Sequence, residues 1–183
     1  PVIDTPTLVI DIGGGSTEYT VGTESIDVFA SIPFGAVTST DSHISSDLPR
    51  PEDLTNLIGA VSDELEDITR DHPIVASPIR TVGVAGTIVT IAAVELGLHE
   101  FDDTALHGMA LSREAVEDVF RTVATEPLAL RVQNPGLGPD RADIIVAGCC
   151  ILVATMRRLQ LSEITVSTRG LLDGVAHRAR LNS

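Results

Sequence analysis

The chain has 183 residues, of which 43% are hydrophobic and only 3% aromatic. This length suits one domain with a sizeable core, and the composition is that of an ordinary globular protein. The formal net charge of −14 would repel nucleic acids, so we expect no nucleic-acid partner and only local binding of any polyanion. All 12 basic residues are Arg. The absence of Lys excludes a Walker A loop and a protein kinase, because both need a Lys on the phosphates.

Neither a membrane span nor a signal peptide is evident. No apolar run approaches the roughly 20 residues that a membrane helix needs, and the N-terminus lacks a basic region. We therefore expect no membrane association and a cytoplasmic location. The sequence has no initial Met and starts almost directly on a predicted strand, which indicates a piece of a longer protein.

The first third of the chain predicts three strands and a helix. Residues 7–12 form a short apolar, β-branched run, and residues 16–22 and 26–34 have strand composition. Tight turns between these strands predict an antiparallel meander. Pro51 then opens a helix whose apolar residues recur at three- and four-residue steps as far as Ile68.

The rest of the chain alternates helices with two more strands. Gly97 is placed to end one of the helices and Ser112 to cap another. The predicted elements are a strand at 79–84, a helix at 87–96, a helix from Ser112, a helix at 140–159, a strand at 163–166 and a last helix at 170–180.

This order predicts a single α/β domain over residues 1–183, with a helical insertion at about 99–140. It is the ribonuclease H-like order of the actin-like ATPase superfold. We expect a mixed five-stranded sheet in the order 3-2-1-4-5, with the fourth and fifth strands parallel to the first. Ligands gather at the carboxyl ends of such strands.

A glycine-rich loop follows the first strand. Gly13, Gly14 and Gly15 add chain entropy and no packing, so their presence indicates close approach of the backbone to a ligand. Successive backbone N–H groups, with the Ser16 and Thr17 hydroxyls, are suited to a phosphate.

Two carboxylates flank this loop, Asp11 before it and Glu18 after it. Carboxylates beside a phosphate repel it unless a cation lies between them, which predicts an Mg²⁺-type ion bound by Asp11 and Glu18. A Rossmann loop is excluded, because its third glycine would fall at Glu18 and a strand follows. A plain hairpin with surface carboxylates remains the alternative.

A second loop joins the fourth strand to its helix. Thr87 has the residue type of an N-cap, and Gly86 and Thr87 would offer free N–H groups to an anion. A plain helix cap explains the same residues. Because the first and fourth strands are expected to be neighbours, both loops should face one cleft.

Three further residues carry open interpretations. Arg141 opens a predicted helix, where a cation opposes the helix dipole, and Arg169 lies between the fifth strand and the last helix. Either could contact a phosphate or form a salt bridge. His107 has no nucleophile near it in the sequence, which favours a structural role.

Five segments resemble the exopolyphosphatase/guanosine pentaphosphate phosphatase (Ppx/GppA) family. LVIDIGGGSTE resembles its second phosphate motif, and GVAGTIVTIAA resembles its adenosine-type motif. LHGMALSREAVEDVF, PGLGPDRADIIVAGCCIL and VSTRGLLDGVA look like its later segments, in the right order. The likeness covers nearly the whole chain, as the C-terminal half of the short, actinobacterial form.

The resemblance implies an Mg²⁺-dependent hydrolase that removes terminal phosphate from inorganic polyphosphate or guanosine pentaphosphate. The metal would lie at Asp11 and Glu18, and the phosphate at residues 13–16 with Gly86 and Thr87. A homodimer is implied by the same resemblance.

Two departures from the family limit this expectation. Its catalytic Glu and first phosphate loop lie upstream, in an N-terminal domain that this chain lacks, so we expect no catalytic base here and little turnover. Thr168 stands where the family often has Asp. The alternatives are a sugar or acetate kinase of the same superfold, or a non-catalytic phosphate or nucleotide sensor.

Overall fold

The computed structural model describes residues 5–78 and 80–170. The helix predicted at 170–180 lies outside these residues, apart from its first position.

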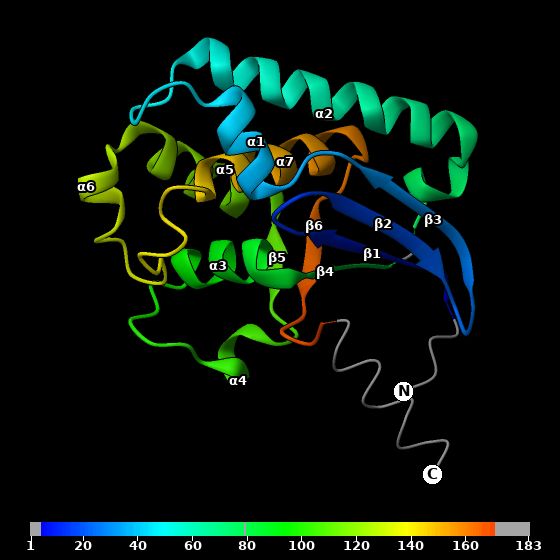
Figure 1. Cartoon of the computed structure of the whole chain (residues 1–183). Helices are drawn as coiled ribbons and strands as arrows, with labels where there is room; N and C mark the ends of the chain where they lie inside the picture. Colours follow the sequence, from blue (N-terminus) through cyan, green and yellow to red (C-terminus); the bar gives the residue numbers. More distant parts are fainter. Residues whose placement is uncertain (1–4, 79, 171–183) are drawn as a thin grey trace.

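Six strands form one sheet in the order β3-β2-β1-β4-β6-β5. The first three make the expected antiparallel meander, and β4 and β6 run parallel to β1. Figure 1 shows the meander on the side of the sheet away from β5. The strands are β1 (Thr7–Ile12), β2 (Thr17–Gly22), β3 (Ile26–Ile32), β4 (Arg80–Val84), β5 (Ala110–Ser112) and β6 (Glu163–Val166).

The predicted strand order is confirmed for five strands, and the count of five is wrong. The sixth, β5, pairs antiparallel with β6 at the sheet edge. It lies inside the stretch that we expected to be a helical insertion. With three residues and a single buried side chain, Leu111, β5 is too short to show the alternation that identifies a strand.

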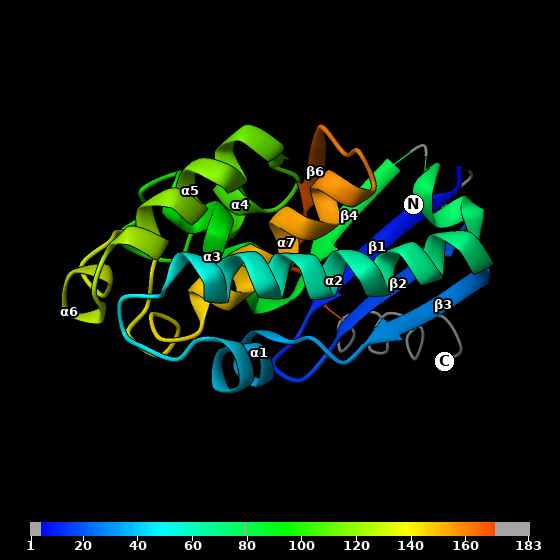
Figure 2. The same ribbon diagram turned by 90° about the horizontal axis from the view of Figure 1, so that it is seen from above.

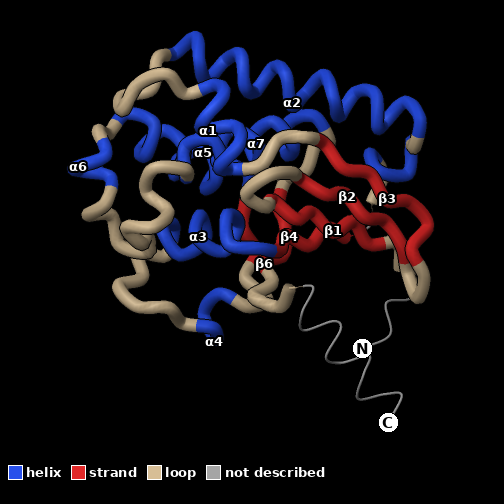
Figure 3. Tube along the Cα trace, viewed as in Figure 1, coloured by secondary structure: helices blue, strands red, loops and turns tan. Residues whose placement is uncertain are grey.

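Helices pack around this sheet. Figures 1 and 2 show α2 lying over the meander and α7 next to α2, near β4 and β6. Figure 3 shows helices extending beyond the sheet on the side away from β3. The helices are α1 (Ala36–His43), α2 (Pro51–Asp71), α3 (Ala85–Glu95), α4 (Asp103–Leu106), α5 (Arg113–Thr125), α6 (Leu128–Arg131) and α7 (Ile145–Arg158), with a 3₁₀ turn at Pro73–Ala76.

The core forms between α7 and one face of the sheet. Every residue of α7 from Ile145 to Met156 is buried. The Tyr19 hydroxyl hydrogen-bonds the Thr155 hydroxyl of α7 at 2.8 Å, so the β2 face that carries Tyr19 looks toward α7. Because side chains alternate along a strand, the neighbouring Glu18 lies on the opposite face.

Two helix assignments differ from the sequence-based expectation. α7 begins at Ile145, and residues 140–144 form turns before it. α1 was not predicted. Its Ser- and Thr-rich sequence, AVTSTDSH, has neither the apolar periodicity nor the residue types that favour a helix. Among the residues described, no helix is both long and apolar enough to cross a bilayer.

Candidate functional site

The two predicted loops emerge side by side at the carboxyl ends of β1 and β4. Asp11 of β1 lies opposite Glu18 of β2 on one side and opposite Val84 of β4 on the other. The glycine loop follows β1, and α3 follows β4 directly. The expectation that the first and fourth strands are neighbours is therefore confirmed.

The carbonyl groups of the glycine loop are bound by α1. Backbone N–H groups of the first three residues of α1 donate to the carbonyls of Gly13 and Gly14 at 2.9–3.1 Å. The Thr38 hydroxyl donates to the Gly15 carbonyl at 3.1 Å. The first N–H groups of a helix have no partner within the helix, so the loop supplies what α1 lacks.

Because α1 binds the loop carbonyls on one side, the N–H groups of the loop face the opposite side. The Gly13 N–H closes the turn by donating to the Ser16 carbonyl at 3.0 Å. Within the described residues, no acceptor is bound by the N–H groups of Gly14, Gly15 or Ser16. Successive N–H groups of this kind can hold an anion.

The two hydroxyls next to the loop are already engaged. The Ser16 hydroxyl donates to Glu18 Oε1. The fully buried Thr17 donates its hydroxyl to the Phe34 carbonyl at 2.6 Å. Thr17 therefore anchors the chain before α1, and its side chain does not face the open side of the loop. Phosphate binding by either hydroxyl stays a prediction.

Gly35 allows the loop and α1 to meet, and its role was not anticipated. A Cβ at Gly35 would lie 2.4 Å from the backbone of both Gly14 and Gly15, a distance at which the backbone itself must shift. A Cβ at Gly14 would meet Val37 of α1 at 3.4 Å. A glycine immediately before an unpredicted helix gave no signal in the sequence.

Asp11 and Glu18 form a cross-strand pair of like charges. Directly opposite residues of an antiparallel pair have Cβ atoms about 4.5–5.5 Å apart, and like charges there are destabilising. Burial, and to a lesser extent the charge of Glu18, raises the pKa of Asp11 above its ordinary value. The Ser31 hydroxyl donates to Glu18 Oε1 at 3.1 Å, which orients that carboxylate.

This donor set fits the predicted Mg²⁺. Mg²⁺ is commonly held by one or two carboxylates, with water and substrate phosphate completing its ligands. Asp11 and Glu18 supply two such groups next to the glycine loop. No cluster of three or more His, Cys, Asp or Glu side chains suited to a metal occurs in the part of the chain that the structure describes.

The second loop is a strained junction. Ala85 has φ of 69°, a left-handed conformation that is uncommon for a residue with a Cβ and often marks functional sites. α3 starts here with Val84 as its N-cap and without a side-chain cap. The prediction of Thr87 as N-cap is wrong. Thr87 lies inside the first turn and is buried, because the strand continues directly into the helix without an intervening turn.

Arg141 covers the beginning of α3. A Cβ at Gly86 would lie only 2.4–2.7 Å from guanidinium atoms of Arg141, so the two residues are in contact. The only ion pair of Arg141 among the described residues is with Asp140, a loose 3.9 Å contact to an exposed carboxylate. Arg141 does not open α7 as expected. It places its charge at the positive end of the α3 dipole instead.

Gly148 of α7 lies where the helices that follow the two loops approach each other. A Cβ at Gly148 would lie 2.5 Å from Thr87 Cγ2 and 3.7 Å from the Ala36 Cβ. The first turns of α3 and α1 therefore converge on one point of α7. α7 therefore positions both loops. The glycine loop is bound to α1, and the second loop lies at the start of α3, where Arg141 covers it.

Arg169, after β6, and His107, after α4, lie in a separate cluster. Arg169 donates to Asp103 Oδ2 at 2.8 Å, and the Thr168 hydroxyl donates to Asp103 Oδ1. These bonds lower the pKa of Asp103, with the Thr168 bond the largest cause. His107 Nδ1 accepts a 3.4 Å hydrogen bond from the Thr168 N–H. The salt-bridge interpretation of Arg169 is thus confirmed.

Comparisons with known proteins agree with this architecture. The Ppx/GppA phosphatase family model matches residues 2–182. Exopolyphosphatase 2 of Mycobacterium tuberculosis is 31% identical, over 93% of this chain and 54% of its own length. Guanosine-5′-triphosphate,3′-diphosphate pyrophosphatase of Aeromonas salmonicida is 27% identical, over 93% of this chain and 33% of its own length. The Aquifex aeolicus Ppx/GppA enzyme structure superposes with a TM-score of 0.86 and 29% identity, over 93% of this chain and 56% of that one.

The sheet order, with loops at the carboxyl ends of parallel strands, defines a domain of the actin-like ATPase fold. Within that class, the chain belongs to the Ppx/GppA phosphatase family. It spans between a third and about half of the length of these curated relatives.

Gly35 provides a test of the loop–helix contact. Gly35→Ala should lower the free energy of unfolding by about 1–3 kcal/mol, because the new methyl group forces the backbone apart. Gly59→Ala is the matched control, since a Cβ there meets nothing within 4 Å in α2. It should raise stability by up to about 1 kcal/mol, because Ala favours a helix over Gly. Urea denaturation followed by circular dichroism measures both. A Gly35→Ala protein as stable as the wild type would contradict the contact.

Proposed function

We propose that this chain is the part of a phosphoanhydride hydrolase that holds the terminal phosphate and its metal ion. The observation that carries the proposal is the orientation of the glycine loop. Because α1 binds its carbonyls, its N–H groups are left for an anion. Asp11 and Glu18 lie directly beside the loop, and a cation bound by both would offset the repulsion between their charges.

The relatives suggest the substrates. Their names specify exopolyphosphatase in one case and guanosine-5′-triphosphate,3′-diphosphate pyrophosphatase in another. The candidate substrates are therefore inorganic polyphosphate and guanosine pentaphosphate. Because the chain covers only part of each relative, the activity of the complete enzyme is proposed by similarity. A cytoplasmic location, a homodimer and the absence of nucleic-acid and membrane partners stay predictions.

Each part of the site has a role in transfer of a phosphoryl group to water. The transition state spreads charge over the equatorial oxygens, so positioning and electrostatic stabilisation dominate catalysis. N–H groups of residues 14–16 would donate to those oxygens, and one well-placed donor is worth roughly 3 kcal/mol. Mg²⁺, held by Asp11 and Glu18, would supply charge neutralisation. Arg141 and the first turn of α3 would hold the next phosphate.

The base that activates water is proposed to lie in a domain beyond this chain. The family resemblance places the catalytic Glu upstream of the glycine loop. Residues 11–18 then supply binding and metal ligation, and the partner domain completes the site.

Metal binding can be tested through stability. Asp11 has a raised pKa, so its ionised form is disfavoured in the folded state and stability falls as the pH rises through its titration. Without a divalent ion at neutral pH, Asp11→Asn should therefore raise the melting temperature by up to about 4 °C. Mg²⁺ should raise the melting temperature of the wild type and not of Asp11→Asn.

Asp63→Asn, at an exposed position of α2, is the control for that experiment and should keep the Mg²⁺ response. Equal Mg²⁺ responses of the wild type and Asp11→Asn would remove the metal from the proposal.

Phosphate binding is tested with tripolyphosphate, which has three linked phosphates and no nucleoside. Arg141→Met should weaken its binding about tenfold or more in calorimetry with Mg²⁺, because a hydrogen bond to a charged group is lost. Arg121→Met is the control, since Arg121 is exposed and pairs with Asp118 within α5. Equal affinity of the wild type and Arg141→Met would contradict the assignment of Arg141.

Phosphate release is the direct test of where the base lies. With Mg²⁺, this chain alone should release phosphate from polyphosphate and from guanosine pentaphosphate at rates near background. Clear release that Asp11→Ala or Glu18→Ala abolishes would place a base within these 183 residues. Binding that survives a chelator unchanged, with no release, would favour the non-catalytic sensor.

A further inference from the structure

A row of three polar residues crosses the meander beside the glycine loop. Asp11 of β1 lies opposite Glu18 of β2, and Glu18 lies opposite Ser31 of β3. Directly opposite residues project from the same face of a sheet, so the three side chains share the face away from α7. The two carboxylates are the proposed metal ligands, and Ser31 extends the row to the edge strand.

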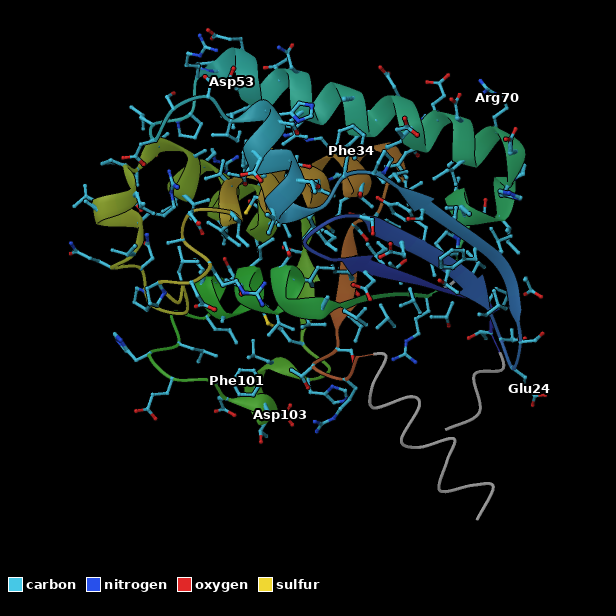
Figure 4. The ribbon with its side chains drawn as sticks, in the orientation of Figure 1. Glu24, Phe34, Asp53, Arg70, Phe101 and Asp103 are labelled. Carbon is cyan, nitrogen blue, oxygen red and sulfur yellow. The ribbon has the colours of Figure 1, made fainter. Side chains whose placement is uncertain are left out.

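Ser31 is held at the loop end of the meander. Figure 4 shows Phe34 near α1, after β3, and Glu24 at the turn before β3, and Ser31 comes three residues before Phe34. The Thr17 hydroxyl donates to the Phe34 carbonyl at 2.6 Å, which connects the end of β3 to the residue before Glu18. The strand pairing and this bond therefore fix Ser31 and Glu18 relative to each other.

Two hydroxyls bind one oxygen of Glu18 and leave the other open. The Ser16 hydroxyl donates to Oε1 from the glycine loop, and the Ser31 hydroxyl donates to the same atom from β3, at 3.1 Å. A carboxylate oxygen has about two lone pairs, so both acceptor positions of Oε1 are in use. Within the described residues, Oε2 accepts no hydrogen bond. Glu18 therefore offers a cation one oxygen, Oε2.

A carboxylate that offers one oxygen suits a small cation. Mg²⁺ demands near-octahedral geometry and usually keeps several waters, whereas Ca²⁺ takes about six to eight oxygen ligands and accepts a carboxylate through one oxygen or both. The short span between the two oxygens of one carboxylate does not fit an octahedron. Loss of the Ser31 bond would free Oε1 to become a second ligand, which would benefit Ca²⁺ more than Mg²⁺.

We propose that Ser31 is a positioning residue for the metal site: with Ser16, its hydroxyl restricts Glu18 to one metal-binding oxygen and so selects Mg²⁺ over Ca²⁺. The inference rests on the proposed function, because it takes the metal position at Asp11 and Glu18 from there. Ser31 acts through Glu18 and does not touch the ion. Ser16 makes a similar bond but belongs to the glycine loop, so Ser31 is where the effect can be separated from phosphate binding.

An isosteric pair of variants at position 31 tests the proposal. Ser31→Thr keeps the hydroxyl, and Ser31→Val has the shape of Thr without it; both residue types favour a strand. The rise in melting temperature is measured over a range of Mg²⁺ concentrations and, separately, of Ca²⁺ concentrations, which gives the affinity for each ion. This measurement needs no substrate and no turnover.

We expect Ser31→Thr to keep the wild-type ratio of Mg²⁺ to Ca²⁺ affinity. Ser31→Val should lower that ratio about fivefold or more, the effect of one lost hydrogen bond. Its Mg²⁺ affinity should fall because Glu18 is no longer fixed, and its Ca²⁺ affinity should stay the same or rise because Oε1 is released. Thr20→Val is the matched control, since Thr20 lies on the same face of β2, two residues from Glu18. It should leave the ratio unchanged.

The outcomes separate positioning from a structural effect and from the metal site itself. Equal ratios in Ser31→Thr and Ser31→Val would overturn the role of Ser31, even if Ser31→Val is less stable without an ion, because a purely structural bond changes stability and not selectivity. The metal site would stand in that case if Asp11→Asn loses the Mg²⁺ response. If the wild type responds to neither ion, the metal site is wrong and the role of Ser31 fails with it. Ser31→Ala also lacks the hydroxyl and takes the place of Ser31→Val if that variant does not fold.

Discussion

The site depends on one interaction, the hydrogen bonds from the first turn of α1 to the carbonyls of the glycine loop. A short Ser- and Thr-rich helix has little stability of its own, and three consecutive glycines have many conformations to lose. Each supplies what the other lacks, because the loop carbonyls accept hydrogen bonds from the unpaired N–H groups of α1 while α1 fixes the loop. The contact requires glycine at position 35, because any side chain there would collide with the loop backbone. The available N–H groups of residues 14–16 follow from it.

α7 extends this constraint to the second loop. A helix buried along nearly its whole length cannot shift without disturbing the core, since interiors are packed as densely as organic crystals. Gly148 lets α1 and α3 approach α7 at one point, so the two loops are positioned by the core rather than by each other. The left-handed Ala85 at the start of α3 is consistent with a junction whose position is imposed by its surroundings.

The sequence predicted what periodicity and residue type encode. The meander and α2 follow from apolar patterns, and the neighbouring positions of β1 and β4 follow from the order of the elements. The meander places Asp11 and Glu18 next to the glycine loop. The features that the sequence could not predict are contacts between distant segments. α1 forms because of the loop, Thr17 bonds the distant Phe34 carbonyl, and Arg141 reaches α3 from a stretch that looked like the start of α7. The type of Thr87 suited an N-cap, yet its position depends on how β4 enters α3.

Because the chain is acidic, a phosphate ligand must be bound by groups that lie close to it. With a net charge of −14, the field of the whole molecule opposes any polyphosphate, so attraction must come from groups within a few ångströms of the ligand. The described site offers the N–H groups of the glycine loop, the start of α3, Arg141 and the cation that Asp11 and Glu18 are suited to hold. A long phosphate chain would gain from these once and meet repulsion over the rest of its length.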